Sequence, residues 1–425
     1  MIEITILSNL GILGTAPAIA CVPEDPSNVD IYFSTDPSPL LQMISGAQKS
    51  LAIEIYTMGD KDVRAAIRTA LAKGIQVRIV KDPTPLGETC FLFSATTAKD
   101  SEDCKDQQAL VREVQATADH GGAYVPFNKS VLCANPAQKC FEHGKMAIVD
   151  GATLLVSTGN FDSTNLCDIQ YNPSHCNRDY NLVTHDSQMI DTLSAVFEND
   201  LKGERYDLAG LLAQAGSPAV TVSPFSLEPL VNFIHSAKTR IRVQEQYLHE
   251  PTINAALQNA AQQNIQVQVD VASPCSFGKP SDKEAAAFSK IYQAFDAAGV
   301  ASRMFTARQK VGGKPGYLHA KAIVVDEERA WVGSVNGSTT SVSNNREFGI
   351  FFNDPLSVRR LIGQMEADFT SPDSESWQEG LQCAELKGVL ENAPFCHCEE
   401  RSDEAIPLQS IDLSGSPRRP SGSSR

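Results

Sequence analysis

Residues 319–336 read HAKAIVVDEERAWVGSVN, and a near copy, HGKMAIVDGATLLVSTGN, occupies residues 143–160. In both copies an aspartate follows the lysine by five residues and an asparagine follows it by 15. Because two stretches keep both intervals, the sequence indicates that the chain contains two related halves.

The repeat extends on both sides of these stretches. The phrase Asn177-Arg178-Asp179-Tyr180 follows the first copy, and Asn345-Arg346-Glu347-Phe348 follows the second. Upstream, GIQVRIV at 74–80 resembles NIQVQVD at 264–270. Repeats of about 20 to 50 residues mark stacked arrays. Since this repeat is far longer, we expect two similar halves that face each other.

The hydrophobic pattern predicts alternating strands and helices. A strand over 51–56, a helix over 63–72 and a strand over 75–80 imply a parallel crossover. Each histidine is followed by a predicted pair of strands, at 145–149 and 153–157 in the first half and at 322–325 and 330–333 in the second. Strands at 180–184 and 348–352 then lead into helices at 187–201 and 355–369.

The residue types in the two copies suit phosphodiester chemistry. A histidine and a lysine two positions apart on a strand point to the same face, so His143 with Lys145, and His319 with Lys321, can reach one phosphate. One histidine can attack phosphorus while the other protonates the leaving alcohol. Lysine and asparagine side chains can neutralise and hydrogen-bond the phosphoryl oxygens.

The two motif aspartates fit a different role. Asp150 and Asp326 lie five residues after their lysines, so they fall on the opposite face of the strand. We therefore interpret both as structural residues, in a turn or in a buried pair.

The pattern His-x-Lys, four residues, Asp, six residues, Gly-Ser-x-Asn resembles the phospholipase D superfamily of phosphodiesterases, over residues from about 30 to about 370. Two copies at identical spacing, each followed by an acidic residue at Asp179 or Glu347, make the resemblance specific. It implies an α/β protein with a pseudo-two-fold duplicated phospholipase D fold. Two mixed β-sheets flanked by helices would hold the active site at the interface of the halves.

The resemblance also implies roles. His143 would be the nucleophile that forms a phosphohistidine, and His319 the general acid and base. A carboxylate, Asp179 or Glu347, would hold the far ring nitrogen of each histidine and fix its tautomer. Neither a metal ion nor another cofactor is implied. The expected catalytic residues are His143, Lys145, Asn160, Asp179, His319, Lys321, Asn336 and Glu347.

The first copy departs from the family pattern. It carries Ser157-Thr158-Gly159 where the motif favours Gly-Ser-x, and Asp162 stands where the second copy has Ser338. Ser338 can donate a hydrogen bond to the phosphate and is the expected substrate-binding residue, whereas an ionised Asp162 cannot donate. The two halves are thus expected to differ in role. We interpret Tyr56 and Tyr247 as occupying equivalent strand ends, where each side chain would either pack in the core or line the cleft.

Composition bears on partners. The chain has 425 residues, 42% hydrophobic and 20% charged, as in soluble globular proteins, and a formal charge of −15. Nonspecific nucleic-acid binding depends on Lys and Arg, so this charge disfavours nucleic acid as a partner without excluding it. A phospholipid substrate, peripheral contact with a membrane and a monomeric state are the expectations.

Cysteines and the N-terminus bear on the compartment. Six of the eleven cysteines lie between Cys90 and Cys176, and the short separations Cys133 to Cys140 and Cys167 to Cys176 are typical of disulfide loops, which form in oxidising compartments. Buried free thiols in a cytosolic protein are the alternative. Residues 4–20 are mildly apolar and end in Ala18-Ile19-Ala20, which suits signal cleavage, although the basic residues of a signal peptide are absent. We expect a periplasmic or secreted protein.

The expected organisation has four parts. Residues 1–27 are a candidate signal peptide and lead-in, 28–215 the first half, 216–377 the second half and 378–425 a tail that is disordered after 398. Residues 82–140 are the part least like the repeat, and about 14 extra residues precede the first histidine there. A substrate-selecting loop and a disulfide-pinned surface excursion are equally compatible with this insertion.

Three functions compete. The leading expectation is hydrolysis of a glycerophospholipid head group through a phosphohistidine, with exchange of the head group when an alcohol replaces water. The alternatives are a nuclease of the same superfamily acting on DNA or RNA, and a transferase that condenses two phospholipids, as cardiolipin synthases do. A catalytically dead binding protein is disfavoured because both halves keep the histidine, the lysine and the asparagine.

Overall fold

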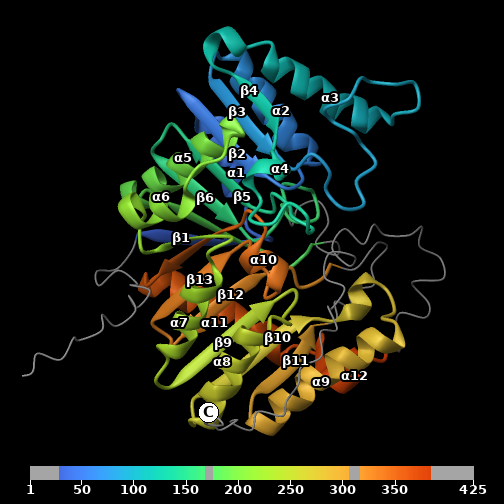
Figure 1. Cartoon of the computed structure of the whole chain (residues 1–425), viewed down its shortest axis with the longest axis vertical. Helices are drawn as coiled ribbons and strands as arrows, with labels where there is room; N and C mark the ends of the chain where they lie inside the picture. Colours follow the sequence, from blue (N-terminus) through green and yellow to red (C-terminus); the bar gives the residue numbers. More distant parts are fainter. Residues whose placement is uncertain (1–27, 168–175, 306–315, 384–425) are drawn as a thin grey trace, which may run out of the picture.

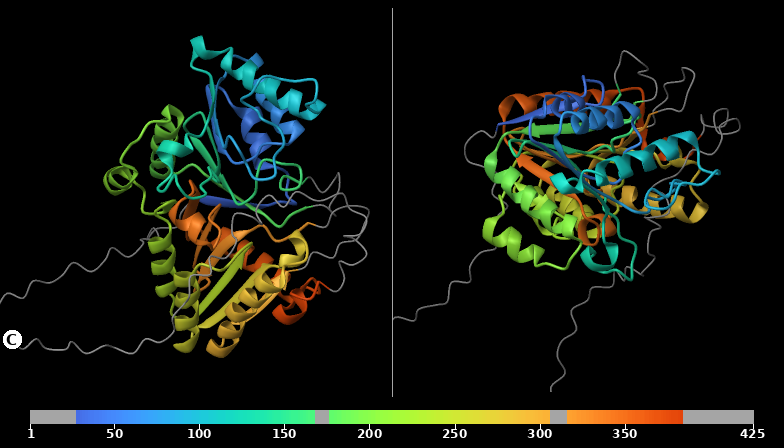
Figure 2. Two further views of the ribbon diagram at one scale, coloured as in Figure 1. Left: turned by 45° about the vertical axis from the view of Figure 1, so that its right-hand side comes forward. Right: turned by 90° about the horizontal axis from the view of Figure 1, so that it is seen from above.

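The computed structural model describes residues 28–167, 176–305 and 316–383. Two β-sheets, one from each half of the chain, lie one above the other, and helices pack around both (Figures 1 and 2). The candidate signal peptide and the part of the tail beyond Cys383 lie outside the described residues. Among the described helices, none combines the length and the apolar character needed to cross a membrane.

The first sheet has seven strands in the order β1-β7-β6-β5-β2-β3-β4. Strands β2, β3 and β4 run parallel to one another, and the remaining neighbours pair antiparallel. The strands are β1 (Val29–Phe33), β2 (Ser50–Ile55), β3 (Gln76–Lys81), β4 (Ala123–Pro126), β5 (Lys145–Val149), β6 (Thr153–Ser157) and β7 (Tyr180–Thr184).

The second sheet has eight strands in the order β15-β11-β10-β9-β12-β13-β14-β8. Apart from β15, each strand has a counterpart in the first sheet at the same position and with the same direction. The strands are β8 (Val220–Val222), β9 (Arg240–Glu245), β10 (Gln266–Ala272), β11 (Ala301–Phe305), β12 (Lys321–Val325), β13 (Arg329–Gly333), β14 (Phe348–Phe352) and β15 (Ser374–Ser376).

Helices complete each half. In the first half they are α1 (Pro39–Gly46), α2 (Lys61–Ala72), α3 (Glu102–Gln115), α4 (Lys129–Leu132), α5 (Ser187–Lys202) and α6 (Leu208–Ala215). In the second half they are α7 (Leu227–His235), α8 (Pro251–Gln262), α9 (Asp282–Ala298), α10 (Thr339–Ser343), α11 (Pro355–Thr370) and α12 (Trp377–Gly380). The expected duplicated α/β fold with two mixed, helix-flanked sheets is confirmed.

The motif aspartates fix the turn between the paired strands of each half. Asp150 and Asp326 have positive φ angles of 56° and 55°, which a short polar side chain tolerates. The Asp150 carboxylate accepts the main-chain N–H groups of residues 48–50 at 2.7–3.2 Å, and Asp326 accepts those of residues 238–240 in the same way. Both aspartates therefore tie the turn to the start of the neighbouring strand.

One hydrophobic core joins the halves. It contains Met146 and Val156 from the first sheet together with Phe348 and Ile350 from the second. A smaller core lies on the other face of the first sheet, beneath α1, α2 and α3. The expected boundary at residue 215 falls between α6 and β8, but the shared core means that the halves form one unit.

Two ion pairs also cross between the halves, one of them buried and the other partly exposed. Arg346 of the second half reaches Asp200 on α5 at 2.7 Å, and Arg178 of the first half reaches Asp368 on α11 at 2.8 Å. Since α5 and α11 are counterparts, the arginine that each repeated phrase contains clamps the closing helix of the other half.

We expect Arg346→Leu to lower the free energy of unfolding by about 3–5 kcal/mol, because it leaves the Asp200 carboxylate buried without its cation. Urea unfolding followed by circular dichroism measures this loss. The double variant Arg346→Leu/Asp200→Leu should recover much of it. Equal stability of Arg346→Leu and the natural protein would contradict the clamp.

A carboxyl near this clamp lacks a donor. Glu54 on β2 is fully buried, and neither of its carboxyl oxygens accepts a hydrogen bond from an N–H or O–H donor of the described residues. Burial, followed by the charges of Asp200 and Glu142, raises the pKa of Glu54 well above its ordinary value of 4.5. Folding therefore favours the protonated acid.

This raised pKa makes stability depend on pH. As the pH rises from about 4.5 toward the raised value, the folded state keeps a proton that the unfolded state has lost, so stability falls. Glu54→Gln removes that dependence, and we expect its advantage in unfolding free energy over the natural protein to grow from pH 5 to pH 8. Denaturant titrations at several pH values measure it, and a constant difference would count against a buried acid here.

Four disulfides lie among the described residues: Cys90–Cys104, Cys133–Cys140, Cys167–Cys176 and Cys275–Cys383. The second and third are the loops expected from the short separations. The fourth ties the chain beyond α12 to the start of the 3₁₀ helix at Pro274–Phe277. The folded chain thus continues to Cys383, past Trp377, where we expected the tail to begin.

Residues 82–140 are more regular than expected. They contain α3 and β4, the counterparts of α9 and β11, so this region is part of the repeat. The added length lies mainly between Lys81 and Glu102, a connection longer than the one from Ala272 to Asp282. The Cys90–Cys104 disulfide closes this longer connection.

Candidate active site

The two motif histidines are each held by a carboxylate of the other half. Nδ1 of His143 lies 2.9 and 3.0 Å from the two carboxylate oxygens of Glu347. Nδ1 of His319 lies 2.8 Å from Oδ1 of Asp179. All four side chains are buried. Each imidazole is therefore oriented through its Nδ1 by a carboxylate of the opposite half.

Short parallel ladders between the halves create these pairs. The main-chain N–H of His143 donates to the carbonyl of Arg346 at 2.8 Å, and the N–H of Arg346 donates to the carbonyl of Phe141 at 2.8 Å. In the same way His319 donates to Arg178 at 3.0 Å, and Arg178 donates to Tyr317 at 2.8 Å. Each repeated phrase therefore runs beside the histidine of the opposite half.

Both carboxylates are kept ionised by their partners. Burial acts to raise the pKa of Asp179, but the His319 ring, Lys321 and the Thr158 hydroxyl outweigh it and leave that pKa below its ordinary value. Burial likewise opposes the effects of His143, Lys145 and Ser341, which together leave the pKa of Glu347 lowered. Two negative acceptors are thus fixed behind the imidazoles.

The motif lysines are buried at the strand ends. Nζ of Lys145 donates to the His143 carbonyl at 2.5 Å, and Nζ of Lys321 donates to the His319 carbonyl at 2.6 Å. Lys321 also reaches the carbonyl of Thr158 in the first half at 3.4 Å. Both ammonium groups therefore lie beside the histidines at the interface.

The strand register shows that Tyr56 and Tyr247 are not equivalent positions in the two halves. Ile55 pairs with Lys145 and Glu245 pairs with Lys321, so the counterpart of Tyr56 is Gln246, and our alignment of Tyr56 with Tyr247 was one residue out. The Tyr56 ring packs edge-on against His143 at 4.8 Å and lies 5.4 Å from Nζ of Lys145. In the second half, Oε1 of Gln246 instead accepts from Lys321 at 3.0 Å. The two lysines thus differ in environment.

The longer β3–α3 connection reaches this site. The main-chain N–H of Leu86 donates to the Tyr56 hydroxyl at 2.7 Å, and Tyr56 packs on His143. The insertion is thus pinned by a disulfide and contacts a site side chain, and selection of a substrate by this loop stays a prediction.

The motif asparagines follow β6 and β13 and are buried. Oδ1 of Asn160 and Oδ1 of Asn336 have no donor within the described part of the chain, so both amides retain hydrogen-bonding capacity for a ligand. Their contact with a phosphate remains a prediction.

Two further positions show how the halves differ. The hydroxyl oxygen of Ser338 accepts the N–H of Ser341 at 3.3 Å and caps α10, so phosphate donation by Ser338 stays a prediction. Its counterpart Asp162 accepts from the Thr57 hydroxyl at 2.5 Å and from the Gly59 N–H. Asp162 therefore orders the loop after β2.

Sequence reasoning missed several partners of the two carboxylates. Asn165 donates to Asp179 at 2.9 Å, and Ser341 donates to Glu347 at 2.5 Å. These residues stand five positions after Asn160 and Asn336, so a polar residue at the same offset in both copies was the available signal. Thr158, which donates to Asp179 at 2.7 Å, lies within the motif itself.

The duplicated fold and the two crossed histidine–carboxylate pairs define an enzyme of the phospholipase D superfamily. A family model described as "Cardiolipin synthase, PLD-like domain" matches residues 40–201 and 230–371, one segment in each half. Because these segments cover more than half of the chain, the protein belongs to this family.

Individual relatives share part of the chain. Cardiolipin synthase A of Pseudomonas entomophila is 29% identical over 172 residues, which are 39% of this chain and 33% of that protein. Cardiolipin synthase A of Pseudomonas putida is 31% identical over 171 residues, 38% of this chain and 31% of that protein. The chain thus matches about a third of the length of these curated relatives.

Solved structures share the fold at low identity. A phosphatidylserine synthase of Haemophilus influenzae superposes with a TM-score of 0.59 at 14% identity, over 85% of this chain and 91% of that one. A polyphosphate kinase of Porphyromonas gingivalis superposes with a TM-score of 0.51 at 13% identity, over 85% and 56% of the two chains. These similarities establish the architecture.

Proposed function

We propose that the protein transfers a phosphatidyl group from a glycerophospholipid to an alcohol through a phosphohistidine. The observation that carries the proposal is the crossed pairing of His143 with Glu347 and of His319 with Asp179, at one interface between the halves. Two oriented imidazoles can divide a displacement at phosphorus into two steps, and each step then has a lower barrier.

In the first step Nε2 of His143 attacks phosphorus while the bond from phosphorus to the leaving alcohol breaks. Nε2 of His319 gives its proton to the departing oxygen. In the second step His319 takes the proton of the incoming alcohol, whose oxygen attacks phosphorus and releases His143. Lys145 and Lys321 oppose the negative charge on the phosphoryl oxygens, with Asn160 and Asn336 as further ligands.

Transfer replaces hydrolysis as the main proposal. The family description and the named relatives are cardiolipin synthases, so they support the alternative expectation better than the leading one. Both reactions use the same intermediate, and hydrolysis occurs when water takes the place of the acceptor alcohol. The net charge of −15 argues against a nucleic-acid substrate.

We further propose that the protein acts as a monomer in the periplasm or outside the cell, in peripheral contact with a membrane. The four disulfides support an oxidising compartment, since such bonds are rare where thiols are kept reduced. The exposed side chains of Phe91, Phe225 and Leu356 offer apolar contacts for a membrane surface.

Purified protein incubated with phosphatidylglycerol vesicles tests the proposal. We expect cardiolipin and free glycerol in equal amounts, detected by lipid mass spectrometry and a glycerol assay. Phosphatidic acid with glycerol would indicate hydrolysis instead. Parallel reactions with phosphatidylcholine, phosphatidylethanolamine and single-stranded DNA define the donor. Cleavage of DNA alone, or no reaction with any phospholipid, would reject phosphatidyl transfer.

A further inference from the structure

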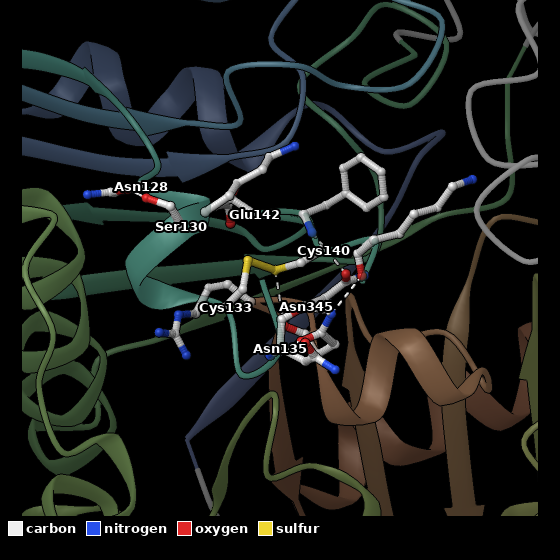
Figure 3. Close-up of a disulfide and its surroundings, with 12 residues drawn as sticks. Asn128, Ser130, Cys133, Asn135, Cys140, Glu142 and Asn345 are labelled. Carbon is white, nitrogen blue, oxygen red and sulfur yellow. Dashed lines mark hydrogen bonds between the residues drawn. A yellow bond between two sulfur atoms is a disulfide. The ribbon is translucent and has the colours of Figure 1, made fainter. Parts of the chain in front are cut away.

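Asn345, which is labelled in Figure 3, opens the repeated phrase that contains Glu347, and its buried amide makes two contacts. Oδ1 accepts the main-chain N–H of Phe141 at 3.0 Å, and Nδ2 donates to Oε1 of Glu347 at 3.1 Å. Phe141 lies two residues before His143, and Glu347 holds the His143 ring. One side chain therefore touches both the backbone that presents the imidazole and the carboxylate that orients it.

The residue before it is anchored to a disulfide loop. Oδ1 of Asn344 accepts the N–H of Asn135 at 2.6 Å, and Nδ2 donates to the carbonyls of Lys139 and Asn135 at 2.7 and 3.2 Å. The Cys133–Cys140 disulfide closes this loop, and Sγ of Cys140 lies 3.2 Å from the Asn344 carbonyl oxygen (Figure 3). The disulfide-closed loop of the first half thus holds the residue immediately before Asn345 by hydrogen bonds.

On the His319 side, two different residues make the contacts that correspond to those of Asn345. Asn177 is the counterpart of Asn345, and its Oδ1 accepts the N–H of Tyr317, two residues before His319, at 3.2 Å. Asn165, however, makes the donation to the Asp179 carboxylate. Among the described residues, the amide of Asn345 alone contacts both the main chain before a motif histidine and the carboxylate that holds that histidine.

We propose that Asn345 is a positioning residue for His143: its amide sets the Glu347 carboxylate against the ring, and the Cys133–Cys140 loop holds that amide in place through Asn344. The inference deepens the proposed function and rests on it, since it assigns to Asn345 the alignment of the nucleophile. A buried donor to the orienting carboxylate restricts the ring to one rotation, which favours the in-line attack on phosphorus.

Asn345→Asp tests this role with a side chain of the same shape. It keeps an acceptor for Phe141 but replaces the donor by a carboxylate oxygen that faces Glu347. We expect kcat at pH 8 to fall about tenfold or more with little change in KM. Toward pH 5 the introduced carboxyl gains a proton and can donate again, so the ratio of its kcat to that of the natural protein should rise. Asn345→Ala, which loses both contacts, should show a ratio that does not vary with pH.

Asn128→Asp is the matched control. It makes the same chemical change and removes a donation of comparable length, from Nδ2 of Asn128 to the Gly203 carbonyl at 2.8 Å, in the same half as the disulfide loop (Figure 3). We expect its thermal stability to fall by a similar amount as that of Asn345→Asp, while its kcat stays that of the natural protein at every pH.

The outcomes separate the inference from the proposed function. If the natural protein processes no phosphodiester, the proposed function fails. If it is active and Asn345→Asp keeps its kcat, the positioning role is overturned. A loss in Asn345→Asp that is equal at all pH values, or that Asn128→Asp shares, would assign Asn345 to stability alone and would also overturn it.

Discussion

His143→Ala is expected to lower the turnover of phospholipid by at least about 10⁴-fold, because no other side chain can form the covalent link to phosphorus. His319→Ala should cause a loss of similar size with natural substrates, whose leaving alkoxides need a proton. Residues that act as one unit are not additive, so the double variant should be no slower than the worse single variant. Initial rates with phosphatidylglycerol measure all three.

The two single variants should differ with an activated substrate. An aryl phosphodiester releases a phenolate that needs no proton, so His319→Ala should retain the first step and show a burst of phenolate before it stalls. His143→Ala should show none. His120→Ala serves as the control, because His120 lies exposed in a 3₁₀ turn and its replacement should leave turnover intact. A burst in His143→Ala and none in His319→Ala would reverse the assigned roles.

Asp179→Asn is expected to lower kcat by about 10⁴-fold through the histidine of the opposite half. The analogous change in an oriented triad has an effect of this size because an amide leaves the imidazole in the wrong tautomer. Here Asp179 accepts from His319 at 2.8 Å, so the variant should behave as His319→Ala does and keep the burst with an aryl phosphodiester. Glu347→Gln should behave as His143→Ala does and lose the burst.

Asp150→Asn provides the control for this pair. Asp150 belongs to the sequence motif but ties a turn to β2, so its replacement should lower the thermal midpoint and leave kcat in place. The pairing between halves predicts that each carboxylate variant behaves in the burst assay like the variant of the histidine in the other half. If Asp179→Asn matched His143→Ala in the burst assay, the pairing between halves would be wrong.

The fold was largely predictable because the same pattern of strands and helices occurs in both halves of the sequence. Strands such as β5, β6 and β7, and helices such as α5 and α11, carry strong hydrophobic patterns and were placed within about two residues of their ends. The helix α3 was missed because it is polar on most of its surface and is flanked by a disulfide-closed connection. Periodicity weakens where a disulfide and ion pairs replace apolar packing.

The candidate site was predictable in its members but not in its pairing. The sequence presents His143, Asp179, His319 and Glu347 as a repeated set, and nothing in the spacing shows that each acid serves the histidine of the other half. That exchange follows from the parallel ladders between residues 141–143 and 345–347, and between 317–319 and 177–178, which form only when the two sheets meet. Asn165, Ser341 and Gln246 contact site residues of their own halves, and they were missed because they lie outside the His-x-Lys motif.

We propose that both halves act on one phosphorus atom, which His143 carries as a covalent intermediate. The most direct test is to quench His319→Ala during reaction with an activated phosphodiester and to map the modified peptide by mass spectrometry at alkaline pH, where phosphohistidine survives. We predict a phosphoryl adduct on His143 and on no other residue. An adduct on another side chain, or an unmodified His143 in protein that has completed the burst, would contradict the account.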